Sequence, residues 1–219
     1  MKKIAVVLCG SGFKDGSEIR ESVASLWALS QPGIESHCFA PDADQVDVVN
    51  CFTGASVLNE KRNMLVEAAR IARGNIKPLS ELDPKQFSGI LLPGGFGVAK
   101  NLCTFASKGS QGEALPELQS ILNEFYLAKK PIGAICIAPA VLALSFIGRH
   151  FDLTVGEQSE ASAEIEKLGH RHIVCQANSC VVDEKNKIVT TPAYMYDRAP
   201  LDEVFSGIKK AVDALIKMS

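Results

Sequence analysis

Short apolar runs of the kind that form buried strands alternate with amphipathic runs along the whole chain. Lys3–Leu8 is continuous, rich in Val and Ile, and ends in a Gly-Ser-Gly loop, which is typical of a buried strand. Glu18–Leu29 predicts a helix with one apolar stripe. That stripe consists of Ile19, Val23, Leu26 and Trp27. The alternation predicts an α/β fold with a mostly parallel central sheet and helices on both faces.

The same reading extends to the rest of the chain. Further strands are predicted at Ile34–Phe39, Ile90–Leu92, Pro131–Ile135, Ile173–Val174, Val181–Val182 and Ile188–Thr190. Further helices are predicted at Leu58–Arg73, Glu113–Ala128, Ala138–Phe146 and Leu201–Lys217. With 219 residues and no linker or repeat, we expect one domain over 1–219.

Charge and cysteine content narrow the class of protein. The net charge of −2 argues against nucleic acid or an anionic membrane as partner, and no apolar run is long enough to span a bilayer. The seven cysteines are odd in number and contain no CxxC pair, so we expect reduced thiols, a cytoplasmic location and no bound metal. The glycines after the first strand match neither a dinucleotide fingerprint nor a P-loop, so no cofactor is expected.

Ligands of parallel sheets bind outside the carboxyl ends of the strands, where three segments of this chain are candidates. They are Gly10–Gly16, Pro93–Gly97 and the turn at Cys136. At Cys136 a buried strand runs almost directly into a helix, which would hold the sulfur at a helix N-terminus and favour the thiolate. The other interpretation is a cysteine packed beneath the first helical turn, and the local pattern favours neither.

Backbone and carboxylate partners for such a thiol are available nearby in the predicted fold. The N–H groups of Gly95 and Ile137 could form an oxyanion hole, although a Gly-Gly turn has a structural explanation as well. Asp15 and Glu18 fit the start of a helix, where they would cap backbone N–H groups. Glu21 falls away from the apolar stripe, so periodicity alone favours a solvated side chain.

Several motifs, taken together and in order, resemble one known family over nearly the whole chain. They include Asp15-Gly16-Ser17-Glu18, Pro93-Gly94-Gly95-Phe96-Gly97, Cys136-Ile137-Ala138-Pro139-Ala140 and Thr191-Pro192-Ala193-Tyr194-Met195. The chain resembles the ElbB-type, isoprenoid-biosynthesis-associated branch of the ThiJ/PfpI superfamily, which is related to class I glutamine amidotransferases.

The resemblance implies a flavodoxin-like three-layer sandwich, commonly a homodimer, and a cofactor-free thiol glyoxalase of the glyoxalase III type, a hydro-lyase. Such an enzyme converts glyoxal, or a related small dicarbonyl, to glycolate. The nucleophilic thiol then falls on Cys136 and the oxyanion donors on Gly95 and Ile137. The carboxylate that contacts the thiol falls on Glu21, or on Glu18 if the match slips by a helical turn.

One departure from the superfamily limits the chemistry. Gly156 stands about where protease-like and amidotransferase members place a histidine, so no histidine is at hand to accept a proton as a base and then donate it to an amine leaving group. Glyoxalase chemistry expels no amine and is less affected. The alternatives are a redox-sensing protein with an oxidisable Cys136, and a regulatory amidotransferase-like subunit linked to isoprenoid biosynthesis.

Overall fold

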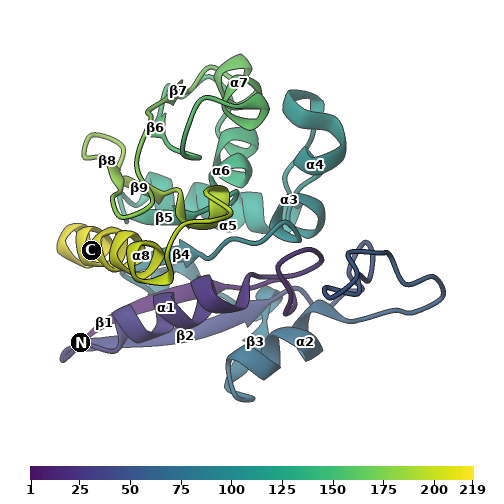
Figure 1. The fold of residues 1–219 in the computed structure, drawn as a ribbon. Helices are drawn as coiled ribbons and strands as arrows, with labels where there is room; N and C mark the ends of the chain where they lie inside the picture. The colour runs from purple at the N-terminus through teal and green to yellow at the C-terminus, as the bar shows by residue number, and fades with distance from the viewer.

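A seven-stranded sheet runs through the middle of the computed structural model, which describes all residues 1–219 (Figure 1). The strand order is β3-β2-β1-β4-β5-β9-β8, and only β8 runs antiparallel to its neighbour. The strands are β1 (Lys2–Val7), β2 (Ile34–Ala40), β3 (Ile76–Pro78), β4 (Gly89–Leu92), β5 (Ile132–Ile135), β8 (Val181–Asp183) and β9 (Ile188–Thr191). A separate two-stranded ladder joins β6 (Asp152–Leu153) to β7 (Arg171–His172).

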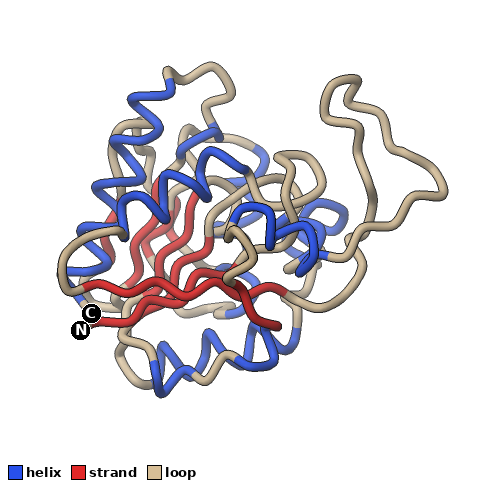
Figure 2. Tube along the Cα trace, turned by 90° about the horizontal axis from the view of Figure 1, so that it is seen from below, coloured by secondary structure: helices blue, strands red, loops and turns tan.

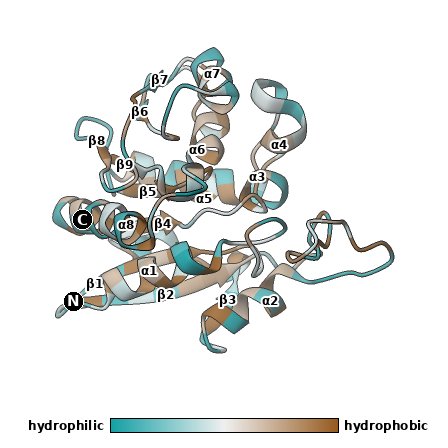
Figure 3. Ribbon diagram, viewed as in Figure 1, coloured by the Kyte–Doolittle hydropathy of each residue, from teal (hydrophilic) through white to brown (hydrophobic).

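Helices flank the sheet on both sides (Figure 2), which confirms the predicted α/β sandwich. They are α1 (Ile19–Leu29), α2 (Met64–Ile71), α3 (Val98–Asn101), α4 (Phe105–Lys108), α5 (Pro116–Leu127), α6 (Pro139–Ser145), α7 (Glu160–Lys167) and α8 (Leu201–Met218), with 3₁₀ turns η1 (Leu79–Glu81), η2 (Pro84–Gln86), η3 (Gly109–Gln111) and η4 (Ala193–Met195). Helix α8 packs along α1 and carries apolar and polar residues on different sides (Figure 3). None of the helices has both the length and the apolar character that crossing a bilayer requires.

The central strands are short and apolar because helices cover both of their faces. Every residue of β4 and β5 is buried, as are Ile4–Val7 of β1. These strands form the middle of the hydrophobic core. Their carboxyl ends lie at one edge of the sheet, where their loops meet.

The predicted orientation of α1 is wrong. Ile19, Val23 and Trp27 are 48%, 46% and 58% exposed, whereas the buried face consists of Glu21, four serines and alanines, and Leu29 at the end of the helix. Small side chains allow α1 to lie close to the sheet and to α8, and this close approach outweighs the burial of the larger stripe. The inference that Glu21 is solvated fails for the same reason.

Boundaries also differ from the prediction between β2 and β3. The predicted helix Leu58–Arg73 is reduced to α2, because the Asn63 side chain caps Val66 N–H at 3.1 Å and starts the helix there. Residues 41–62 instead form a projecting arm, visible in Figures 1 and 2, with short pairings such as Val49 with Ser56.

Other short elements were missed or misplaced. Strand β3 and the ladder of β6 with β7 were not predicted, and residues 173–174, predicted as a strand, follow β7 as irregular backbone. Helices α3, α4 and α7 were also missed, since each is only one or two turns long.

Two of the strand-end loops touch through their backbones at Gly97. A methyl group on Gly97 would lie 2.2 Å from the backbone nitrogen of Gly16, although the φ of Gly97 is helical. We expect Gly97→Ala to lower the free energy of unfolding by about 2–4 kcal/mol, because backbone must move on both sides. Urea denaturation followed by circular dichroism measures this loss.

The matched control is Gly74→Ala, where φ is +79° and no atom lies within 4 Å of the added methyl group. This change costs only the left-handed backbone penalty of about 1 kcal/mol. An equal loss of unfolding free energy in the two variants would contradict a role for the contact between the loops at Gly97 and Gly16.

Candidate active site

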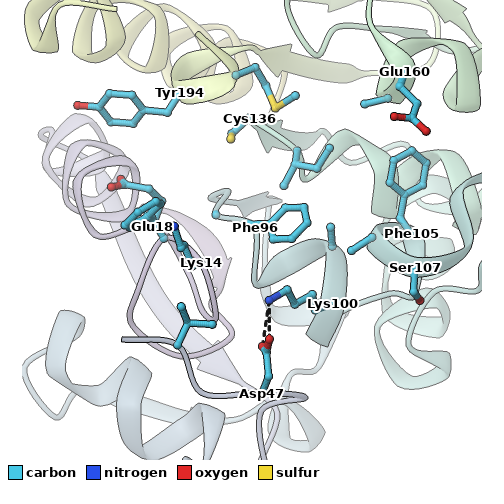
Figure 4. A pocket seen from close by; sticks show the side chains of 18 of the residues that line it. Lys14, Glu18, Asp47, Phe96, Lys100, Phe105, Ser107, Cys136, Glu160 and Tyr194 are labelled. Atoms are coloured by element: carbon cyan, nitrogen blue, oxygen red, sulfur yellow. Dashed lines mark hydrogen bonds and ion pairs between the residues drawn. The ribbon is translucent and has the colours of Figure 1, made fainter. Parts of the chain in front are cut away.

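An open cleft of about 1020 Å³ lies where the loops after β1, β4 and β5 meet (Figure 4). Cys136, Ile137 and Gly95 form part of its wall, together with Phe96 and Tyr194. The arm contributes the opposite wall through Asp47, Val49, Gly54 and Ser56. The cleft therefore has the position expected of a ligand site in a parallel α/β sheet.

Cys136 occupies a sharp turn between β5 and α6. Its φ is +62°, a left-handed conformation that non-glycine residues rarely adopt and that costs on the order of 1–3 kcal/mol. The turn is held by hydrogen bonds from Cys136 N–H to Thr191 O and from Ala138 N–H to Ile135 O, both 2.9 Å. The geometry matches a nucleophile elbow, which presents a reactive side chain at the edge of the sheet.

Glu21 lies directly behind the thiol in the first turn of α1, and its side chain is fully buried. Its Oε1 accepts a hydrogen bond from Tyr194 N–H at 3.1 Å, while Oε2 has no partner in hydrogen-bonding geometry. The thiol of Cys136 lies close enough to interact with this carboxyl. A buried carboxyl oxygen without a partner is free to exchange a proton with the sulfur or with a ligand.

Glycine at position 94 allows the carboxyl and the thiol to meet. A methyl group there would lie 2.4 Å from the Cys136 Cβ and 2.6 Å from Glu21 Oε2. The Gly94 carbonyl also accepts a hydrogen bond from Glu18 N–H at 2.8 Å, which fixes the start of α1 against the loop after β4. From the sequence, Gly94 is notable only as part of the Gly-Gly turn, and its role between the carboxyl and the thiol is not predicted.

Two backbone N–H groups lie near the sulfur of Cys136. Those of Gly95 and Ile137 interact with the Cys136 thiol, and neither donates to a backbone carbonyl. Unpaired N–H groups at such a position stabilise a negative charge on sulfur or on an oxygen bonded to the adjacent carbon. The structure thus brings together all four residues predicted from the sequence: Cys136, Glu21, Gly95 and Ile137.

Burial affects the protonation of both groups, and the thiol differs from the prediction. Burial, reinforced by the nearby Glu18 carboxylate, raises the pKa of Glu21 to about 8. Burial and the Glu21 carboxylate raise the pKa of Cys136 well above its usual value, against the lowering influence of the Gly95 and Ile137 N–H groups. The expectation that the helix N-terminus would lower the pKa of this thiol is therefore wrong for the resting site, because burial outweighs it.

The other predicted candidates have structural roles or lie elsewhere. Glu18 lines the cleft, but its carboxylate caps α1 by accepting Glu21 N–H at 2.6 Å. Asp15 is buried and accepts Val49 N–H at 2.8 Å, which ties the arm to the loop after β1. Gly156 lies against the Tyr196 ring, and no histidine lines the cleft. No group of three His, Cys, Asp or Glu side chains is placed to hold a metal ion.

The raised pKa of Glu21 links stability to pH. A carboxyl that holds its proton more tightly when folded contributes fully below its usual pKa of 4.5, and this contribution is lost as the pH rises towards 8. We therefore expect Glu21→Gln, which stays neutral, to gain stability relative to wild type between pH 5 and pH 9, by a few kcal/mol. Urea denaturation at a series of pH values measures the difference, with the exposed Glu124→Gln as the control. A difference independent of pH would contradict the assignment.

The Glu21 carboxylate also controls the reactivity of the thiol. At pH 9 this carboxylate is ionised in wild type and disfavours the thiolate of Cys136. We expect Glu21→Gln to accelerate alkylation of Cys136 by iodoacetamide at this pH, as measured by peptide mass spectrometry. Exposed Cys51 provides the reference rate within each sample. A slower or unchanged relative rate at Cys136 would show that the two groups are not coupled.

Comparison with known proteins agrees with this architecture. The model of the DJ-1/PfpI family matches residues 2–197. The chain is 41% identical to the human protein named glutamine amidotransferase-like class 1 domain-containing protein 3, mitochondrial, with 99% of this chain and 83% of the human protein covered. A crystal structure from Ehrlichia chaffeensis, described as an isoprenoid biosynthesis protein with amidotransferase-like domain, is 38% identical, covers 100% of this chain and 99% of its own, and has a TM-score of 0.91.

A more distant solved structure shares the fold alone. Glyoxalase III from Candida albicans is 15% identical, with 98% of this chain and 97% of that chain covered, at a TM-score of 0.63. The family match over most of the chain and the two similar proteins above establish the relationship that the motifs predicted. The chain belongs to the DJ-1/PfpI family.

Proposed function

We propose that this protein is a cofactor-independent thiol glyoxalase that converts glyoxal, or a related small dicarbonyl, to glycolate or the corresponding 2-hydroxy acid. The observation that supports this most is the buried Glu21 carboxyl, with its unpartnered oxygen, behind the Cys136 thiol. A carboxyl whose pKa is raised to about 8 by burial suits proton transfer near neutral pH. No histidine lines the cleft, which disfavours amide hydrolysis.

The first step joins the thiol to the substrate. In the singly protonated pair the Glu21 carboxylate accepts the thiol proton while the Cys136 sulfur attacks one aldehyde carbon. The resulting oxyanion lies against the N–H groups of Gly95 and Ile137. Glu21 then passes the proton to this oxygen, which gives a hemithioacetal and restores the carboxylate.

The second step is an internal isomerisation. Glu21 removes the C–H proton of the hemithioacetal carbon, and the enediolate that forms is stabilised by the same two N–H groups. The proton returns to the neighbouring carbon, and the hydroxyl proton moves to the neighbouring oxygen, so the product is a thioester of the 2-hydroxy acid. Water hydrolyses this thioester and releases glycolate and the free Cys136 thiol. The net reaction of glyoxal is the addition of one water.

Glu21 rather than Glu18 is proposed as the proton carrier. Glu18 lines the same cleft, but it caps the first turn of α1 through its hydrogen bond to Glu21 N–H. Its remaining influence is electrostatic, because its charge raises the pKa of Glu21.

The assembly, the location and the number of domains are also part of the proposal. The exposed stripe of Ile19, Val23 and Trp27 on α1 is an apolar surface that a homodimer would cover. Residues 1–219 are proposed to form one domain, since a single sheet takes its strands from both halves of the chain.

The cytoplasm remains the proposed location for free thiols, although the name of the human relative places that protein in mitochondria. A link to isoprenoid biosynthesis is supported only by the description of the Ehrlichia protein.

The alternative is a redox-sensing or regulatory protein without efficient turnover. Oxidation by peroxide requires a thiolate, and burial opposes thiolate formation at Cys136 in the resting site. Rapid conversion of Cys136 to a sulfenic acid at micromolar peroxide, together with no turnover of dicarbonyls, would favour this alternative.

The roles of the two groups predict distinct variants. Cys136→Ala should abolish the formation of glycolate, because no covalent adduct can form. Glu21→Gln should lower kcat on the order of 10²–10⁴-fold, the usual loss on removing a general acid-base. Glu18→Gln should reduce kcat far less and act mainly on stability. The assay is glycolate formation from glyoxal, with circular dichroism of each variant as the check on folding.

Two outcomes would overturn the mechanism. Wild-type turnover in Cys136→Ala would exclude the covalent route. Near-wild-type turnover in Glu21→Gln, beside an inactive but folded Glu18→Gln, would move the proton-transfer role to Glu18.

A further inference from the structure

We infer that the cleft takes a 2-oxoaldehyde larger than glyoxal, with an apolar or aromatic body that lies on Phe13 and Phe96 and an anionic end that binds Lys14. The inference rests on the proposed glyoxalase chemistry at Cys136 and names the class of substrate. It is carried by the size of the cleft, by two exposed aromatic rings in its wall and by an unpaired ammonium group.

The cleft is far larger than the proposed reaction requires. Glyoxal has four non-hydrogen atoms, whereas a cleft of about 1020 Å³ lies at the upper end of the range that encloses drug-sized ligands. Cys136 occupies only one part of the wall, as Figure 4 shows. A ligand that reacts at Cys136 therefore has room for a substantial body beyond its aldehyde.

Two phenylalanine rings provide an apolar surface for this body. Phe13 and Phe96 line the cleft and are 44% and 49% exposed, although large aromatic side chains are usually buried more completely. Their backbones are joined by a hydrogen bond from Phe96 N–H to Phe13 O of 2.7 Å. Phe96 directly follows the proposed oxyanion donor Gly95, so these rings lie beside the place proposed for the reacting carbonyl.

Two of the three lysines that line the cleft lie beside these rings, Lys14 at Phe13 and Lys100 at Phe96, and they differ in whether a carboxylate pairs with them. Lys100 is neutralised by Asp47, with Nζ 2.8 Å from Oδ2. Lys14 has no carboxylate within ion-pairing distance, and its Nζ lies 5.5 Å from the centre of the Phe13 ring. It extends towards the arm, since a methyl group on Gly54 would lie 2.8 Å from its Nζ. An unpaired ammonium beside an aromatic ring suits a ligand that carries a carboxylate or phosphate.

None of the acidic residues that line the cleft pairs with Lys14; they are Glu18, Asp47, Glu160, Glu164 and Asp197. Glu18 accepts the N–H of Glu21, and Glu164 pairs with Lys167. Glu160 lies across the cleft from Lys14 (Figure 4). The Lys14 side of the cleft is thus suited to a negative group.

A kinetic comparison of three substrates tests the inference. We expect kcat/KM of wild type to rise from glyoxal to phenylglyoxal, and again to the meta- or para-carboxyphenylglyoxal. Lys14→Gln should remove most of the last gain, roughly tenfold, and leave glyoxal unchanged within twofold. Phe96→Ala should lower kcat/KM for both aryl substrates relative to glyoxal. Lys185→Gln, a change at an exposed lysine on the hairpin of β8 and β9, is the matched control and should alter none of these ratios.

A binding measurement separates this inference from the proposed function. Cys136→Ala, which cannot form the adduct, is titrated with 4-(hydroxymethyl)benzoate and with benzyl alcohol and followed by calorimetry. Tighter binding of 4-(hydroxymethyl)benzoate than of benzyl alcohol, with the difference lost in the Cys136→Ala, Lys14→Gln double variant, supports the ligand class. If the same protein turns over no dicarbonyl, that result overturns only the proposed glyoxalase activity. Equal binding of both compounds, or binding of the carboxylate unaffected by Lys14→Gln, would overturn the inference, as would turnover of all three dicarbonyls at the same kcat/KM.

Discussion

The close contact at Gly94 is the constraint on which the rest of the site depends. The loop after β4 passes between the start of α1 and the elbow after β5, and the absence of a side chain at Gly94 allows both to approach. Its carbonyl fixes α1 through Glu18 N–H, and this anchoring turns Glu21 inward. One backbone segment therefore determines where the carboxyl, the thiol and the Gly95 N–H stand relative to one another.

The site is costly to the folded protein in two ways. Cys136 is held in a left-handed conformation, and Glu21 is buried with one oxygen unpartnered. Both features persist because the surrounding strands and loops are packed tightly enough to impose them. Features of this kind are expected where chemistry, and not stability, determines a residue. The raised pKa of Glu21 then keeps a proton in the site near neutral pH, where a solvated carboxyl would have lost it.

The sequence predicted the sheet well and the helical faces less well. Strands β1, β4 and β5 are continuous apolar runs covered on both sides, so local pattern and tertiary burial agree. In α1 they conflict, because close packing buries small and acidic residues and leaves the large apolar stripe of Ile19, Val23 and Trp27 exposed. The orientation of Glu21 followed from the family motifs, whereas periodicity gave the wrong side of the helix.

Some features of the site had no readable local signal. The arm at 41–62 has no regular element of its own, and its contacts, such as that of Asp47 with Lys100, join residues far apart in the chain. The pKa of Cys136 depends on burial, which no single motif encodes. Gly94 and Tyr194 lay within motifs that the resemblance used, but only the structure shows that their backbones position Glu21.

Burial of Glu21 and Cys136 has a consequence for the ionic surroundings. Both side chains are buried, so their mutual interaction is screened little, whereas a group on the open side of the cleft is screened over a Debye length of about 8 Å at physiological salt. Proton transfer at the elbow is therefore insulated from ionic strength, while attraction of a charged ligand to the cleft weakens as salt is added. Added salt would alter the encounter with a ligand and leave the chemistry that follows almost unchanged.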